Sequence, residues 1–286
     1  MTLLYEEKYM YRANVQTQTM TPNYAAIKAK QQATWGSGDY GRVGVTLQIT
    51  GEELCEAMDL HAGAQVLDVA GGNGNVSLAA ARRFCKVVST DYVQTLLDHS
   101  RTRATAEGLA MDYQLADAEE LPFEDASFDH VVSTFGVMFT PNQAQAANEL
   151  QRVCRPGGKI GLANWTPSGF IGQLFRTIGR YVPPPAGVNS PAVWGTQEFL
   201  RGHFGDRATA IESTEKVFNF RYQSPEHWID VFTRYYGPTL KAFQSLEAGH
   251  AASLREDILA LIARFNQARD GSMVVPSDYL EVVVTL

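Results

Sequence analysis

Short apolar runs alternate with helical patterns through the middle of the chain. The runs have the length and composition of β-strands, and the segments between the early ones have the 3.6-residue spacing of helices. An amphipathic helix near 52–58 precedes the first run, and we predict strands near 64–69, 86–90, 111–116, 128–134 and 158–164. Strands that alternate with helices predict an α/β fold with a parallel sheet.

The pattern changes after Trp165. The stretch GFIGQLFRTIGRY (169–181) has helical spacing, and the prolines of the following VPPPAGVNSPAV exclude a regular helix or strand interior. Strand-like segments near 208–222 and 279–286 complete a predicted sheet of seven strands. Two helical segments, 225–246 and 251–267, lie between those last two strands.

A glycine-rich segment follows the first strand of the predicted sheet. In VLDVAGGNGNVSL (66–78) the apolar run ends at Asp68, and Gly71, Gly72 and Gly74 precede a new helical pattern. Without a Cβ, the backbone can turn tightly and lie close to a ligand, and the amides of a helix N-terminus favour bound anionic groups. Ligands of open α/β sheets bind outside the carboxyl ends of the strands. The segment therefore predicts a nucleotide-binding loop, and the alternative is a tight connection without a ligand.

Two further strands end in acidic residues. Asp91 closes KVVST and Asp117 lies in YQLADA. Asp91 is 17 positions beyond Gly74, close to the ~20 expected for a carboxylate that binds ribose hydroxyls, although it could instead cap the next helix. A dinucleotide fingerprint that starts at Gly72 requires a third glycine where Ser77 stands, which argues against a nicotinamide cofactor.

Together these motifs resemble the class I S-adenosylmethionine-dependent methyltransferases, in particular the small-molecule type 11 group that includes the ubiquinone and menaquinone C-methyltransferases. The resemblance spans about residues 35–204. DVAGGNG (68–74) is similar to the family's D-x-G-x-G-x-G, with Ala70 at the first glycine. STDYV, the segment 117–133 and RPGGKIGLANW follow in the family's order and spacing.

The resemblance implies a Rossmann-like, doubly wound, seven-stranded and mostly parallel sheet with an N-terminal cap and helical lid insertions. We divide the chain into a cap segment (1–50), a cofactor-binding core (51–165) and a part that completes the core (166–286). That last part carries two hypothetical substrate-lid insertions, 166–195 and 225–270.

The resemblance also assigns parts of S-adenosylmethionine to positions of this chain. Gly72 and Gly74 would face the methionine part, Asp91 the ribose, and Asp117 with the Ala118 amide the adenine edge. The segment Ser133 to Met138 would line the floor under the sulfonium, and within it Ser133 and Phe135 would be contacts or could be packing residues. Trp35 and Tyr40 would belong to a cap over the cofactor, or could anchor a hinge loop. The full set of expected cofactor-binding residues is Trp35, Tyr40, Asp68, Ala70, Gly71, Gly72, Gly74, Asp91, Tyr92, Asp117, Ala118, Glu119, Ser133 and Phe135.

Methyl transfer from a sulfonium is an in-line displacement that creates no oxyanion. The protein contributes mainly by aligning donor and acceptor and by excluding water, and a general base is optional. His227, Tyr235 and Tyr236 of the predicted lid are the candidate catalytic residues. The lid aromatics Trp228, Phe232, Tyr235, Tyr236 and Phe243 are typical of a helix packed on the sheet, or of a pocket for a planar or hydrophobic acceptor.

Composition narrows the class of protein. A net charge of −7 and a pI near 5.4 argue against nonspecific nucleic-acid binding. Three widely spaced cysteines suggest neither a disulfide framework nor a zinc site. The N-terminus lacks a signal-peptide pattern and no apolar run reaches 18 residues, so we expect a cytoplasmic protein without a membrane span.

We therefore predict a methyltransferase that acts on a small, aromatic or hydrophobic acceptor and uses S-adenosylmethionine. The alternatives are a nucleotide- or NAD-dependent oxidoreductase and a protein that binds the cofactor without catalysis. The fold serves oxygen, nitrogen, carbon and sulfur acceptors alike, so the sequence does not name the atom that is methylated. Nor does it indicate the oligomeric state.

Overall fold

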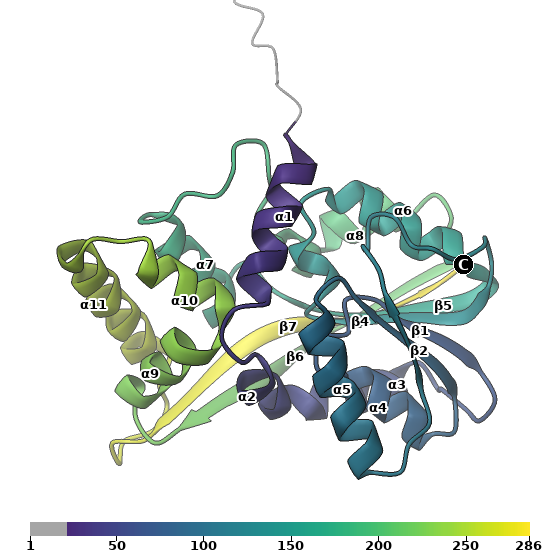
Figure 1. The fold of residues 1–286 in the computed structure, drawn as a ribbon, viewed down its shortest axis with the longest axis horizontal. Helices are drawn as coiled ribbons and strands as arrows, with labels where there is room; N and C mark the ends of the chain where they lie inside the picture. Colours follow the sequence, from purple (N-terminus) through teal and green to yellow (C-terminus); the bar gives the residue numbers. More distant parts are fainter. Residues whose placement is uncertain (1–21) are drawn as a thin grey trace, which may run out of the picture.

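The computed structural model describes residues 22–286, so the first 21 residues of the predicted cap segment lie outside it. Seven strands form one sheet in the order β3-β2-β1-β4-β5-β7-β6 (Figure 1). Strands β1 to β5 are parallel, and β7 runs antiparallel to both of its neighbours. The predicted mostly parallel, seven-stranded fold is confirmed. The strands are β1 (Gln65–Asp68), β2 (Lys86–Asp91), β3 (Asp112–Leu115), β4 (Phe128–Thr134), β5 (Cys154–Trp165), β6 (Ala210–Tyr222) and β7 (Met273–Thr285).

Helices cover both faces of the sheet, as parallel strands require of their crossover connections. Figure 1 shows α3, α4 and α5 on one side of the sheet and α6 and α8 on the other. The helices are α1 (Tyr24–Trp35), α2 (Gly41–Gly44), α3 (Gln48–Ala57), α4 (Asn75–Arg82), α5 (Gln94–Ala106), α6 (Gln143–Val153), α7 (Phe170–Gly179), α8 (Gln197–Phe204), α9 (Pro225–Tyr235), α10 (Gly237–Gln244) and α11 (Ala248–Phe265). Short 3₁₀ turns are η1 (Val45–Leu47), η2 (Val137–Phe139) and η3 (Pro191–Gly195).

The segment between β6 and β7 differs from the sequence prediction. The single helix expected over 225–246 is two helices, because Tyr236 is extended (φ −90°, ψ 104°) and α10 starts anew with Pro238 in its first turn. A proline inside a longer helix would lack the N–H that donates to the preceding turn, whereas in a first turn nothing is lost. The break turns the chain sharply at Tyr236.

The last strand is longer than predicted. It starts at Met273 rather than near 279 and includes Pro276, which pairs with Asn219 of β6. On its other side β7 pairs with β5 only from Tyr279 onward, so Pro276 lies where β7 has a single neighbour. A proline is tolerated there because its missing N–H would face no partner strand.

The main hydrophobic core continues from the sheet into helices α7, α9 and α11. Phe170, Phe220 and Trp228 are at most 2% exposed, and the Phe170 ring contacts those of Phe220 and Trp228. Figure 1 shows these helices gathered over the end of the long β6–β7 hairpin. Helices α7, α9 and α11 therefore share the core of the sheet. Within residues 22–286, no helix combines the length and apolarity needed to cross a bilayer.

Candidate active site

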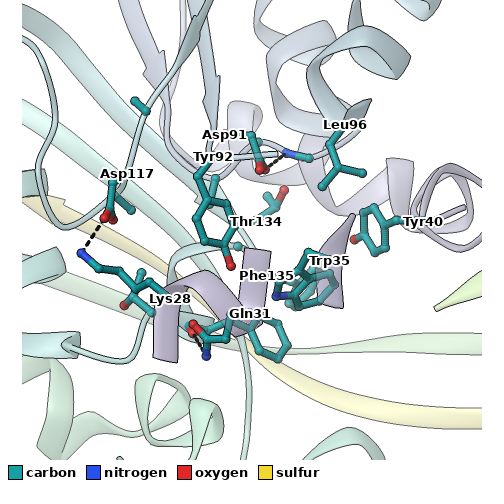
Figure 2. Close-up of a pocket in the computed structure, with 18 of the residues that line it drawn as sticks. Lys28, Gln31, Trp35, Tyr40, Asp91, Tyr92, Leu96, Asp117, Thr134 and Phe135 are labelled. Atoms are coloured by element: carbon teal, nitrogen blue, oxygen red, sulfur yellow. Dashed lines mark hydrogen bonds and ion pairs between the residues drawn. The ribbon is translucent and has the colours of Figure 1, made fainter. Parts of the chain in front are cut away.

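A cavity of about 780 Å³, partly open to solvent, lies beyond the carboxyl ends of β1, β2 and β4 (Figure 2). We call it the cofactor cavity. It gathers residues that the sequence placed in a cofactor site, namely Trp35, Tyr40, Ala70, Gly71, Gly72, Asp91, Tyr92, Asp117, Ala118, Glu119 and Phe135. Two of its other lining residues, Thr134 and Gly136, lie in the segment 133–138 that was expected under the sulfonium. The rest were not predicted: Lys28, Gln31, Asn73, Asn75, Leu96, Ala116, Phe139, Thr140 and Pro141.

The glycine-rich loop forms one wall of the cofactor cavity. Its backbone is left-handed at Ala70 (φ 53°), Gly72 (φ 58°) and Gly74 (φ 84°). Such a backbone costs a residue with a Cβ roughly 1–2 kcal/mol, so Ala70 carries strain that a glycine would not. Room for the Ala70 side chain comes from Gly136, where an added Cβ would lie 2.9 Å from that of Ala70. Gly74 faces Ser100 of α5 instead of the cavity.

Asp68 lies behind the loop, outside the lining of the cofactor cavity. Its buried carboxylate accepts a hydrogen bond from the Ser77 hydroxyl, and a Cβ on Gly71 would lie 2.6 Å from its Oδ2. Burial raises the pKa of Asp68 to about 7, against the lowering effect of the Ser77 hydroxyl. Asp68 and Ser77 thus support the loop from beneath. A glycine at 77, as in the dinucleotide fingerprint, would have no hydroxyl to donate.

Asp91 lies inside the cofactor cavity and is 4% exposed. Its Oδ2 accepts from the Gly72 amide at 3.0 Å and its Oδ1 from the Val93 amide at 2.9 Å. Burial raises the pKa of this carboxyl to about 6 despite those two donors. A carboxylate accepts more than two hydrogen bonds, so Asp91 retains capacity for two further donors. Its chemistry fits the two hydroxyls of a ribose.

Cofactor binding should therefore release a proton in mildly acidic solution. Without ligand Asp91 is protonated below pH ~6, and two hydroxyl donors favour its ionised form. We expect the affinity for S-adenosylmethionine to fall as the pH drops below that value, with proton release visible in calorimetry as a heat that depends on the buffer.

The control for this prediction is Asp91→Asn, which should abolish the buffer dependence. Asp68, Tyr40 and Arg103 are also titratable and lie nearby. The pKa of Tyr40, about 12, is far above the acidic range of the experiment, whereas that of Asp68, about 7, is close to it. Buffer-dependent heat that persists in Asp91→Asn would assign the proton to Asp68 and contradict the prediction.

Helix α1 crosses the cofactor cavity at the end formed by Asp117 and Glu119. Lys28 Nζ lies 2.5 Å from Asp117 Oδ2 and 3.0 Å from Glu119 Oε2 (Figure 2). Gln31 Nε2 donates to the Phe139 carbonyl at 3.1 Å. The helix lies within the predicted cap segment, 1–50, but Lys28 and Gln31 were not among the expected cofactor-binding residues. A signal was present, since Lys28, Gln31 and Trp35 follow the i, i+3, i+7 spacing of one helix face.

A second cavity of about 430 Å³ adjoins the first, and we call it the acceptor cavity. Trp35, Tyr40, Phe135 and Phe139 line both cavities. The other lining residues are Val43, Leu47, Trp165, Ile171, Leu174, Phe175, Phe220, Phe232 and Tyr236. Phe135 and Trp165 are stacked, with ring centroids 4.0 Å apart. Trp228 and Phe232 of α9 are buried and stacked, and Phe232 also lines this cavity.

Of the three candidate catalytic residues, Tyr236 alone lines the acceptor cavity. His227 lies in the first turn of α9, where its Nδ1 accepts from the Gln223 amide at 3.3 Å. The Tyr235 carbonyl accepts from the Asp39 amide at 3.0 Å, and the Tyr235 ring faces Arg42. Neither His227 nor Tyr235 lines either cavity, because the chain turns away from α9 at Tyr236.

Ser133 is buried beneath the cavities. Its hydroxyl donates to the Val69 carbonyl at 2.7 Å and accepts from the Val137 amide at 3.0 Å, which fixes the turn after β4. The part of the chain from 22 to 286 contains no group of three His, Cys, Asp or Glu side chains that could hold a metal ion.

Comparisons with known proteins agree with this arrangement. A family model described as a methyltransferase domain matches residues 67–162. The uncharacterized protein Rv1405c of Mycobacterium tuberculosis (strain ATCC 25618 / H37Rv) is 38% identical over 244 residues, which cover 84% of this chain and 89% of the relative. A demethylmenaquinone methyltransferase from Deinococcus radiodurans is 36% identical over 132 residues, 45% of this chain and 55% of the relative.

The fold is shared with solved structures. A putative methyltransferase from Bacillus halodurans C-125 superposes with a TM-score of 0.56 at 21% sequence identity, and the alignment covers 82% of this chain and 96% of that one. At that identity the likeness concerns the fold alone.

Proposed function

This chain belongs to the class I S-adenosylmethionine-dependent methyltransferases of the type 11 group, and on that premise we propose that it methylates a small aromatic or hydrophobic molecule held in the acceptor cavity. Family membership decides between the alternatives left open by the sequence. The protein is a methyltransferase that uses S-adenosylmethionine, rather than an NAD-dependent oxidoreductase or a binding protein without catalysis.

The observation that carries the proposal is the wall shared by the two cavities. Trp35, Tyr40, Phe135 and Phe139 line both, so molecules in the two cavities would lie directly against each other. The acceptor cavity is lined by aromatic and aliphatic side chains, which favour an apolar, planar guest. The relative from Deinococcus radiodurans is named for a quinone acceptor, which supports the same class of substrate.

We assign the cofactor to the first cavity residue by residue. Asp91 would bind the ribose hydroxyls, the Gly71–Gly72 backbone the methionine part, and Asp117 with the Ala118 amide the adenine. Asp68, Ser77, Gly74 and Ser133 lie outside the lining and would position the loops that touch the cofactor.

Methyl transfer requires of the protein mainly that it aligns the acceptor with the methyl group and excludes water. Bound S-adenosylmethionine supplies an electrophilic methyl group. Helix α1, held by Lys28 and Gln31, and the aromatic wall would exclude water and align the acceptor with that methyl group.

The test is transfer of a radiolabelled methyl group from S-adenosylmethionine to a panel of acceptors. The panel contains naphthols, hydroxynaphthoquinones and phenols, with glycine, ethanolamine, a protein mixture and RNA as polar competitors. We expect label in the apolar aromatic products. Label confined to the polar acceptors would overturn the proposed substrate class.

Phe175→Ala should impair use of the acceptor but not binding of the cofactor. Phe175 lines the acceptor cavity but not the cofactor cavity, and its ring centroid lies 5.6 Å from that of Phe139. Losing this wall should lower kcat/KM for an aromatic acceptor by roughly 1–3 kcal/mol, or about 5- to 150-fold. The Kd of S-adenosylmethionine should stay within about twofold.

The matched control is Phe265→Ala. Phe265 is also partly buried and contacts an aromatic ring, that of Phe170, but it lines neither cavity. Equal losses of kcat/KM in the two variants would mean that the effect comes from general loosening of the core, and the assignment of the acceptor cavity would fail.

A further inference from the structure

Polar groups are scarce on the wall of the acceptor cavity. Among the described residues, its side-chain polar atoms are the indole N–H groups of Trp35 and Trp165 and the hydroxyls of Tyr40 and Tyr236. All of these can donate a hydrogen bond. Within residues 22–286, no carboxylate, imidazole or amine contributes to this lining. The wall thus offers donors but no group that would accept a proton near neutral pH.

The two tyrosines lie next to each other at the boundary with the cofactor cavity. Their ring centroids are 6.2 Å apart, and the Trp35 ring lies 5.8 Å from Tyr40 and 5.4 Å from Tyr236. Figure 2 shows the hydroxyl of Tyr40 directed toward Trp35. Neither tyrosine hydroxyl has a hydrogen-bond partner in the part of the chain that the structure describes, which leaves both free for a guest.

The surroundings keep both hydroxyls protonated. Burial raises the pKa of Tyr40 to about 12, helped by Asp91 and opposed by Arg103. Burial also raises the pKa of Tyr236, and the neighbouring Tyr40 adds to this. The charged groups on the adjoining turn, Asp39 and Arg42, pair with each other at 3.4 Å. At neutral pH the two phenols are donors and cannot serve as general bases.

We propose that the natural acceptor is an acidic phenol or enol that binds as its oxyanion, with the hydroxyls of Tyr40 and Tyr236 donating to that oxygen. The inference rests on the proposed function and narrows its substrate class. The acceptor's proton leaves to solvent before binding, so the cavity needs no base.

The reaction balances without an oxidant, a reductant or another co-reactant. An electron pair of the anion, on its oxygen or on a conjugated carbon, forms the bond to the methyl carbon, the carbon–sulfur bond breaks, and its pair goes to sulfur to give S-adenosylhomocysteine. Methylation at oxygen gives the ether directly, and methylation at carbon gives a neutral ketone whose ring proton passes to solvent when a phenol re-forms. The positive sulfonium and the negative acceptor enter as a neutral pair, which lowers the cost of placing the anion against an apolar wall. Tyr236 is then a donor to the substrate rather than the base considered in the sequence analysis.

The test uses 4-nitrophenol, whose ionised form is followed by its visible absorbance, with protein saturated by sinefungin, an unreactive cationic analogue of the cofactor. We expect the pKa of bound 4-nitrophenol to fall by about one unit or more. The shift should be smaller with S-adenosylhomocysteine, which has no sulfonium charge. A bound pKa that is unchanged or raised overturns the inference.

Tyr→Phe variants test the contribution of each hydroxyl to binding, because they remove the hydroxyl and keep the ring. Tyr40→Phe and Tyr236→Phe should each weaken binding of 4-nitrophenolate about tenfold or more, while 4-nitroanisole, the uncharged ether, should bind within about twofold of wild type. Tyr113→Phe, on β3 at a position that lines neither cavity, is the control. Variants that bind the anion as wild type does would contradict the role of the hydroxyls.

The pH dependence of kcat/KM tests whether the protein supplies a general base. Across phenols of similar shape, the break in log kcat/KM against pH should follow the pKa of each acceptor. A break at one pH for every acceptor would reveal a base of the protein and overturn the inference, while the proposed function would stand. If neither 4-nitrophenol nor 4-nitroanisole binds although S-adenosylmethionine does, the proposed substrate class fails as well.

Discussion

Replacing Asp91 by alanine is expected to weaken binding of S-adenosylmethionine by roughly 1–3 kcal/mol, or about 5- to 150-fold, because hydrogen bonds from the ribose hydroxyls to a charged acceptor are lost. Asp91 is buried in the cofactor cavity, where solvent screens those bonds little. Calorimetric titration of the wild type and the variant measures the difference directly.

Two controls separate this loss from a change of structure. Asp98→Ala removes a carboxylate from the exposed face of α5 and should leave the Kd unchanged. Asp91→Asn retains one acceptor toward the loop amides and should fall between wild type and alanine. An Asp91→Ala protein that binds S-adenosylmethionine as tightly as the wild type would remove Asp91 from the site.

Trp165→Ala should lower the free energy of unfolding by about 3–5 kcal/mol, the usual cost of truncating a large buried aromatic. Trp165 ends β5, is 4% exposed and stacks on Phe135, and its ring also contacts those of Phe220 and Tyr279. The lost ring leaves a hole where the sheet, the turn after β4 and the acceptor cavity meet. Urea unfolding followed by circular dichroism measures the loss.

The comparison is Phe84→Ala, a truncation at a position that is 80% exposed, where a change within about 0.5 kcal/mol is expected. Trp165→Phe retains a ring against Phe135 and should recover much of the stability. A Trp165→Ala loss no larger than that of Phe84→Ala would show that the stacked pair does not hold the two cavities together.

Local sequence patterns were sufficient to place the glycine loop and Asp91 at the same edge of the sheet. In a parallel sheet the carboxyl ends of the strands meet at one edge, so a glycine loop after β1 and Asp91 at the end of β2 lie close together once the strand order is known. Asp68 follows the same pattern, yet it lies under the loop. The motif predicts that Asp68 ends the strand, but not the direction in which the Asp68 side chain points.

The position of α1 and the lining of the acceptor cavity depend on contacts between residues far apart in the chain. Lys28 and Asp117 are 89 residues apart in the chain, and their ion pair exists only because α1 crosses the cofactor cavity. His227 and Tyr236 both fell in one predicted helix, and the break before Pro238 separated their environments. A helical pattern shows which residues are apolar, whereas a turn of the backbone decides which of them reach the cavity.

The most direct test of this account is calorimetric titration of the purified protein with S-adenosylmethionine, S-adenosylhomocysteine and NAD side by side. The account predicts micromolar binding of the first two and none of NAD, since we propose that Asp91 and the glycine loop bind one nucleoside with a methionine tail. Binding of NAD alone, or of none of the three, would contradict it.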